Sequence, residues 1–154
     1  KRMSMKLNLR EAIIFFLGFF FSSIVSAEEI FLSLKKNKVN VRYGPSFNSP
    51  IKYIYKKINL PIKQIDKKEN FRRIIDYKKN SGWIHISQLS KKTAAIVIED
   101  KLIVFNNPTI YSKPKVVLNK GRLCLIVKCK NEWCKVKVDK YKGWVKKDSL
   151  WGRL

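Results

Sequence analysis

The chain has 154 residues, 45% of them hydrophobic and 12% aromatic, which is enough for one ordinary domain or two very small ones. The spread of apolar residues along the whole chain excludes general disorder. The formal charge of +23 favours anionic partners, although the Lys-, Ile- and Asn-rich composition is also what an AT-rich genome produces.

The first 27 residues have the three parts of a secretory signal peptide. A basic opening contains Lys1, Arg2, Lys6 and Arg10, an apolar run follows from Ala12, and small residues end at Ala27. We expect cleavage after Ala27 and a periplasmic or secreted protein with no membrane span. The alternative is a retained signal anchor, for which the apolar stretch is short, because a bilayer needs about 20 residues. Cleavage would remove four basic residues and one acidic residue and leave a net charge of +20.

The remaining residues contain two repeats. Gly82-Trp83-Ile84 matches Gly143-Trp144-Val145, at an interval of 61 residues, and each motif is followed by a leucine five residues after the β-branched position. Upstream, two prolines and an aromatic turn recur in the same order, as Pro45, Pro50 and 69–71 in one copy and Pro108, Pro114 and 131–133 in the other. The repeats predict domains over residues 28–92 and 93–154, and the join at Lys91–Thr93 is too short for freely moving domains.

The local patterns in both repeats are those of β-strands. In the first repeat Val39, Val41 and Tyr43 alternate with polar residues, and in the second Val136 and Val138 do the same. Turn residues separate these short segments, and no helical periodicity is sustained after residue 27. We therefore predict an all-β protein of two tandem small SH3-like β-barrels after the signal peptide.

The first repeat resembles the bacterial SH3 (SH3b) family. Its segment Val39-Asn40-Val41-Arg42-Tyr43-Gly44-Pro45-Ser46 is similar to the opening motif of that family, and Gly82-Trp83-Ile84 is similar to its last strand. The second repeat diverges at its opening, where Asn107-Pro108 stands in place of Gly-Pro, while its ending resembles tandem SH3 proteins exported by proteobacteria. The resemblance implies a binding role, since family members often bind peptidoglycan, act as adaptors or accompany wall hydrolases.

The residues that catalysis would need are scarce. His85 is the only histidine, and we interpret it as a partly exposed strand residue rather than a catalytic base. Three cysteines without a Cys-x-x-Cys pair do not provide a zinc site, and neither a pair of catalytic carboxylates nor a phosphate-binding glycine loop is indicated. We expect no enzyme activity, no metal and no cofactor.

Two cysteines flank a predicted hairpin turn. If Asn131-Glu132 form a two-residue turn, Lys130 pairs with Trp133 and Cys129 faces Cys134. This arrangement permits a cross-strand disulfide in an oxidising compartment, the alternative being two free, buried thiols. Cys124 alternates with leucines in a strand, so we interpret it as a spare thiol that is buried or partnered in another chain.

Aromatic and basic residues near the turns are the candidate ligand-binding residues. Rings of this kind can stack on a sugar or a peptide while a neighbouring cation meets a carboxylate. The leading hypothesis is an exported module that recognises peptidoglycan or another envelope component. The alternatives are an envelope adaptor that binds a protein partner such as a wall enzyme and, third, an anion or nucleic-acid binder without sequence specificity. The candidate residues are Arg42, Tyr43, Phe47, Tyr53 and Tyr111.

Overall fold

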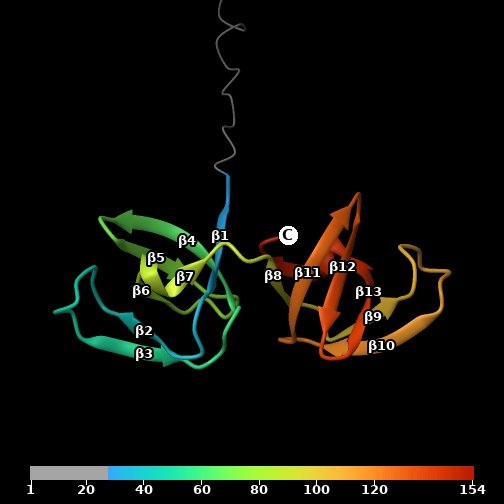
Figure 1. Ribbon diagram of the computed structural model, residues 1–154, viewed down its shortest axis with the longest axis horizontal. Helices are drawn as coiled ribbons and strands as arrows, with labels where there is room; N and C mark the ends of the chain where they lie inside the picture. The colour runs from blue at the N-terminus through green and yellow to red at the C-terminus, as the bar shows by residue number, and fades with distance from the viewer. Residues whose placement is uncertain (1–27) are drawn as a thin grey trace, which may run out of the picture.

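The computed structural model describes residues 28–154 as two separate seven-stranded antiparallel sheets, each of which curls into a small barrel (Figure 1). This confirms the predicted all-β fold of two tandem SH3-like barrels. The expected signal peptide, residues 1–27, lies outside the described residues.

The first barrel is built from strands in the order β3-β2-β6-β5-β4-β1-β7. A single 3₁₀ turn, η1 (Ile86–Gln88), follows the Gly-Trp strand. The strands are β1 (Ile30–Leu34), β2 (Val39–Arg42), β3 (Ile51–Tyr55), β4 (Pro61–Lys68), β5 (Phe71–Ile75), β6 (Ser81–His85) and β7 (Leu89–Ser90).

The second barrel repeats this plan in the order β10-β9-β13-β12-β11-β8-β14, with η2 (Lys147–Ser149) in the place of η1. The strands are β8 (Ala94–Val97), β9 (Lys101–Phe105), β10 (Pro114–Asn119), β11 (Leu123–Lys130), β12 (Trp133–Val138), β13 (Tyr141–Lys146) and β14 (Leu150–Gly152).

The longest strand of each barrel is bent by an irregularity in its pairing. The register shifts between Gln64 and Asp66 in β4, and between Ile126 and Lys128 in β11. Such bulges bend a strand and increase its twist. In the first barrel β4 pairs with β1 over residues 61–64 and with β5 over residues 63–68, and a bend between the two ends of the strand helps the sheet to close.

The alternating apolar side chains of each repeat fill its barrel. The first core contains Leu34, Val39, Val41, Leu60, Ile62, Ile74 and Ile84. The second contains Ala95, Val97, Leu102, Val104, Leu118, Cys124, Ile126, Cys134, Val136, Val138, Val145 and Leu150.

The two barrels pack directly against each other, with β8 on the side of the second barrel that faces the first (Figure 1). All four residues of β8 are buried, because Ala95 and Val97 point into the second core while Ile96 belongs to the first. At the same junction the rings of Phe31 and Trp151 meet edge to face at 5.0 Å. The barrels are therefore joined by a shared apolar contact as well as by the short connection.

Candidate functional site: a basic and aromatic groove

Arg42 organises the loop that joins β2 to β3. It is the last residue of β2, and its Nη1 donates to the carbonyl oxygens of Phe47 (2.9 Å) and Ser49 (2.7 Å). The backbone N–H of Tyr43 closes the same loop by donating to the carbonyl of Pro50 (3.1 Å). Because one guanidinium holds two loop carbonyls, the loop is fixed in place beside strand β6.

A shallow groove of about 300 Å³ lies where this loop meets β5 and β6. Tyr43 stands at its edge with 65% of its surface exposed. The ammonium of Lys52 lies 5.6 Å from the centre of the Tyr43 ring and donates to the carbonyl of Ser81 at 2.9 Å. The lining residues are Arg42, Tyr43, Lys52, Arg73, Ser81, Gly82 and Trp83, which include three cations, two aromatic rings and no carboxylate.

Phe47 extends the aromatic surface beyond Arg42. It is 61% exposed, and its ring lies 5.7 Å from the Arg42 guanidinium carbon. On its other side it packs against Phe71 at 5.2 Å and His85 at 4.8 Å. The Nδ1 of His85 lies 2.8 Å from the Ser87 hydroxyl, so the single histidine is held within an aromatic cluster.

Tyr53 lies apart from the groove, packed against the first core. Its hydroxyl is 3.3 Å from that of Tyr55, which in turn donates to the buried carboxylate of Asp76 at 2.9 Å. Burial is the main cause that raises the pKa of Tyr53 and, more strongly, that of Tyr55. These hydrogen bonds make Tyr53 part of the barrel's internal structure.

Tyr111 belongs to the second barrel, in the loop between β9 and β10, and is 92% exposed. It is not among the residues that line the groove of the first barrel. Of the five residues chosen from the sequence, the structure thus brings Arg42, Tyr43 and Phe47 together and leaves Tyr53 and Tyr111 elsewhere.

Among the charged and aromatic residues of the groove, Lys52, Arg73 and Trp83 are not selected from the sequence. The repetition of Trp83 as Trp144 favours a purely structural interpretation of that tryptophan. The strand register explains its position: Trp83 pairs with Arg42 on one side and with Arg73 on the other, so this half-buried residue lies between two basic residues in the sheet. The alternation of side chains along β5 and β6 could have indicated both residues from the sequence, because it puts Arg73 and Trp83 on the face opposite the core residues Ile74 and Ile84.

The second barrel carries a related face around Trp144. Lys115 donates to the carbonyl of Lys142 at 2.9 Å, as Lys52 does to Ser81. In the second barrel, however, the tryptophan is only 8% exposed, and the ammonium groups of Lys128 and Lys135 lie over its ring at 5.7 and 5.8 Å. The equivalent aromatic ring is therefore covered by lysines.

The predicted hairpin turn at Asn131-Glu132 has the expected register, with Lys130 opposite Trp133 and Cys129 opposite Cys134. Asn131 has a positive φ of 52°, which asparagine adopts more readily than most residues. Cys129 and Cys134 are joined by a disulfide across Cα atoms 4.0 Å apart. Cys124 is free and buried, and burial raises the pKa of its thiol to about 12.

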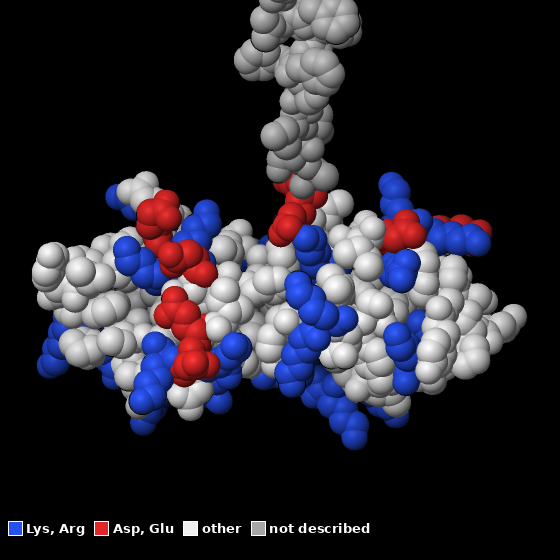
Figure 2. Space-filling view, turned by 180° about the vertical axis from the view of Figure 1, so that it is seen from behind, with Lys and Arg blue, Asp and Glu red and all other residues white. Residues whose placement is uncertain are grey.

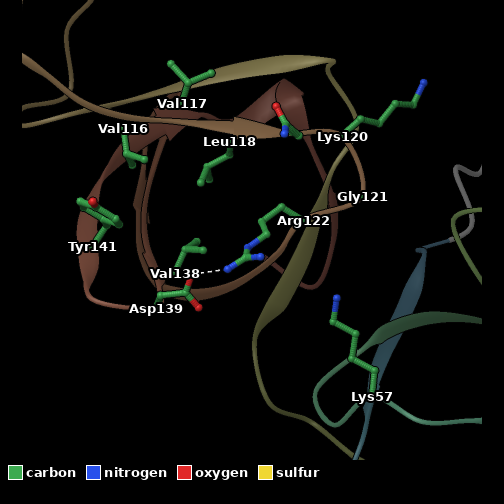
Figure 3. A pocket seen from close by; sticks show the side chains of 11 residues that line it. Lys57, Val116, Val117, Leu118, Lys120, Gly121, Arg122, Val138, Asp139 and Tyr141 are labelled. Carbon is green, nitrogen blue, oxygen red and sulfur yellow. Dashed lines mark hydrogen bonds and ion pairs between the residues drawn. The ribbon is translucent and has the colours of Figure 1, made fainter.

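A larger hollow, of about 420 Å³, lies at one end of the second barrel (Figure 3). Its wall includes Lys57 from the first barrel and Tyr141 from the second. Arg122 and Asp139 form an ion pair within it. Because this arginine is already paired with a carboxylate, the hollow offers a weaker site for an anion than the groove around Trp83.

The charges of the described residues are largely uncompensated by direct pairing. Within residues 28–154 the structure has two salt bridges, Lys63–Glu29 and Arg122–Asp139. Figure 2 shows Lys and Arg side chains on both barrels, while acidic side chains gather in a few groups. The surface therefore attracts anions over a wide area, and the groove adds aromatic rings to that general attraction.

The part of the chain that the structure describes has neither a cluster of metal-ligating side chains nor a helix that could span a membrane. No group of three or more His, Cys, Asp or Glu side chains is placed there to hold a metal ion. Among the same residues, no helix has the length and apolar character needed to cross a bilayer.

The chain is similar in structure to three solved NlpC proteins. NlpC2 from Trichomonas vaginalis has 12% identity and a TM-score of 0.38, over 82% of this chain and 49% of that one. NlpC1 from Trichomonas vaginalis has 13% identity and a TM-score of 0.36, over 83% and 47%. An NlpC/P60 family protein from Bacillus cereus ATCC 10987 has 10% identity and a TM-score of 0.36, over 79% and 56%. The chain thus spans about half the length of these structures, and the likeness says nothing of its activity.

Comparison of the sequence with known proteins gives a family but no individual relative. No curated protein sequence matches the chain significantly. The sequence profile described as bacterial SH3 domain matches twice, over residues 35–91 and 99–152. These two matches coincide with the two barrels, and the chain belongs to the bacterial SH3 domain family.

Proposed function

We propose that this chain is an exported, non-catalytic binding module that recognises peptidoglycan through the groove of its first barrel. Three cations line that groove together with Tyr43 and Trp83, no carboxylate is among the lining residues, and none of the three cations forms a salt bridge within residues 28–154. Peptidoglycan offers matching chemistry, since its sugars can stack on rings and its peptides carry carboxylates. The fixed loop beside the groove keeps Tyr43 presented, which lowers the entropic cost of binding.

A binding role without catalysis fits the chemical groups of the described residues. His85 is packed among aromatic rings and bonded to Ser87, the Cys124 thiol is buried, and the other two cysteines form a disulfide. The Ser87 hydroxyl does lie 2.8 Å from Nδ1 of His85, but that nitrogen also accepts the backbone N–H of Ser87. No side-chain hydrogen bond found in residues 28–154 orients the other ring nitrogen, as the third group of a catalytic triad would. The proposal places the protein in the periplasm or outside the cell, after removal of residues 1–27.

The test is retention of residues 28–154 on purified peptidoglycan sacculi at physiological salt with excess DNA as competitor. We expect binding that survives the DNA and that falls about tenfold in Tyr43→Ala, because aromatic side chains such as tyrosine often carry a large share of the affinity of a binding site. The matched control is Tyr111→Ala, which removes an even more exposed tyrosine from outside the groove and should bind normally.

Three outcomes would overturn the proposal. Complete loss to the DNA competitor would mean that charge alone acts. Equal binding by Tyr43→Ala and the unsubstituted chain would exclude the groove. No retention on any wall preparation would exclude the peptidoglycan ligand.

The second candidate is an adaptor that binds an envelope protein by adding a strand to the first sheet. Strand β3 is the outermost strand of that sheet and exposes Ile51 and Ile54. An unpaired strand edge with apolar side chains is a surface to which an extended peptide can add. A stoichiometric protein partner recovered after crosslinking, together with absence of sacculus binding, would favour this candidate.

A further inference from the structure

The two barrels differ in charge at one equivalent pair of positions. The first position of the pair comes directly after the bulge in the long strand, β4 or β11, and the second lies opposite it in the next strand, β5 or β12. The second position also pairs with the tryptophan of the Gly-Trp motif on its other side. In the first barrel Asp66 lies opposite Arg73, a pair of unlike charges. In the second barrel Lys128 lies opposite Lys135, a pair of like charges. Like charges directly opposite each other in a sheet are destabilising, so the second pair needs a reason.

Neither lysine of this pair forms a salt bridge with a carboxylate in residues 28–154 that would offset this repulsion. Both ammonium groups lie over the ring of Trp144, at 5.7 and 5.8 Å from its centre. None of the hydrogen bonds and salt bridges found in residues 28–154 engages either ammonium. The negative face of the ring attracts the two cations, and each of them keeps its hydrogen-bond donors for another partner.

The same face continues with a third lysine. The ammonium of Lys146 lies 4.7 Å from the centre of the Trp133 ring, which packs edge to face against Phe105 at 5.9 Å. Lys146 and Trp133 are also direct neighbours across β12 and β13. The outer face of the second barrel therefore presents three ammonium groups, each on an aromatic support.

We propose that Lys128 and Lys135 form a second anion-binding site, which takes a carboxylate of the same peptidoglycan that the first barrel binds. The proposal rests on the proposed function for its ligand. Since Trp144 is 8% exposed, its ring lies beneath the lysines, and the ammonium groups make the contact with the anion. A carboxylate between them would accept a hydrogen bond from each and remove their mutual repulsion.

The packing of the barrels allows one polymer to bind at both sites together. Because Ile96 lies in the first core and Trp151 packs on Phe31, the two sites are held at a fixed separation. A polymer that repeats its carboxylates can then occupy both sites at once, and the second contact adds avidity because it forms within one complex. A short fragment can occupy only one site at a time.

The experiment follows the indole N–H signals of the ¹⁵N-labelled chain, residues 28–154, during titration with short soluble peptidoglycan fragments at physiological salt. The four tryptophans report on different places: Trp83 on the first groove, Trp144 and Trp133 on the second site, and Trp151 on the junction. Replacing each tryptophan in turn by phenylalanine assigns the signals. We expect saturable shifts of Trp83 and Trp144 and an unchanged Trp151.

The variant Lys128→Asp copies the acid–base pair of the first barrel and should leave the fold intact, which the unchanged Trp151 signal checks. We expect it to abolish the Trp144 shift, to keep the Trp83 shift and to lower retention on whole sacculi about tenfold or more. Lys36→Asp is the control, because it makes the same change in charge at an exposed position of the first barrel. It should keep both shifts.

The outcomes separate the two proposals. A Trp83 shift without a Trp144 shift would overturn the second site and leave the first groove intact. A Trp144 shift that persists in Lys128→Asp would overturn the assignment of the site to the lysine pair. A Trp144 shift that persists with fragments whose carboxylates have been amidated would overturn the assignment of the ligand to a carboxylate. Absence of the Trp83 shift alone would count against the proposed function instead.

Discussion

At the scale of single residues, the three cysteines differ in state, and thiol titration can distinguish them. Cys124 is buried and its pKa is raised to about 12, while Cys129 and Cys134 are bonded to each other. Since the thiolate is the reactive form, we expect no thiol to react with a disulfide reagent in the native protein at pH 8. One should react after unfolding, and three after unfolding with a reductant. Three reactive thiols in unreduced, unfolded protein would contradict the disulfide.

A second residue-scale prediction concerns stability at high pH. The pKa of Tyr55 is raised above its usual value of about 10, mainly by burial and with the carboxylate of Asp76 as a further cause. Above pH 10 the unfolded chain therefore loses a proton that the folded chain keeps, and the free energy of unfolding must fall as the pH rises. Denaturant unfolding between pH 8 and 11 measures this fall. Tyr55→Phe should show a shallower fall, and an equal slope in both proteins would contradict the role of Tyr55 in it.

At the scale of elements, the glycine of each Gly-Trp motif marks a close crossing of strands. A Cβ on Gly143 would lie 2.5 Å from both the carbonyl oxygen of Phe105 and Cγ1 of Val104, in the neighbouring strand β9. We expect Gly143→Ala to lower the free energy of unfolding by about 1–3 kcal/mol, since the strands must move apart. Thermal unfolding followed by circular dichroism measures the loss. Lys142→Ala, at an exposed position one residue earlier, should change the free energy of unfolding little. Equal losses of stability in the two variants would contradict a close contact between the strands at Gly143.

The elements themselves are predictable because their signals are local. Alternation such as that of Val39 and Val41 determines which side chains enter the core, and the repeated Gly-Trp motif indicates where each barrel ends. The hairpin at Asn131-Glu132 is predictable in the same way, since a two-residue turn sets the pairing on both sides of it. None of these features depends on contacts between distant segments.

The groove is only partly predictable, because its residues come from four strands, β2, β3, β5 and β6, and from the loop after β2. Tyr43 lies within the motif that resembles the opening of the family, so the local sequence indicates it. Arg73 and Trp83 reach the groove through the register of β5, β6 and β2, which the sequence does not specify residue by residue. Tyr53 looks equivalent to Tyr43 in the sequence, and only the chain of hydroxyls to Asp76 distinguishes it as an internal residue.

At the scale of the whole molecule, the contact between the barrels has a signal in the sequence as well. The run Ala94–Ile98 is apolar at every position, as expected for a strand that is covered on both faces. Its alternate side chains enter different cores, Val97 the second and Ile96 the first. A short join restricts the separation of two domains, but a strand that contributes to both cores also fixes their orientation.

This shared strand predicts that the barrels unfold together. Ile96 is fully buried among residues of the first barrel although it belongs to the second. We expect Ile96→Ala to cost about 2–5 kcal/mol, as for other buried Ile-to-Ala replacements, and to lower the protection of amides in both barrels. Hydrogen exchange at Ile62 and Ile84 in the first barrel, and at Val136 and Val145 in the second, measures this. Ile98→Ala, the exposed position two residues on, is the control and should leave both sets protected. Loss of protection in one barrel alone would show that the contact does not couple them, and the fixed separation on which two-site binding depends would then fail as well.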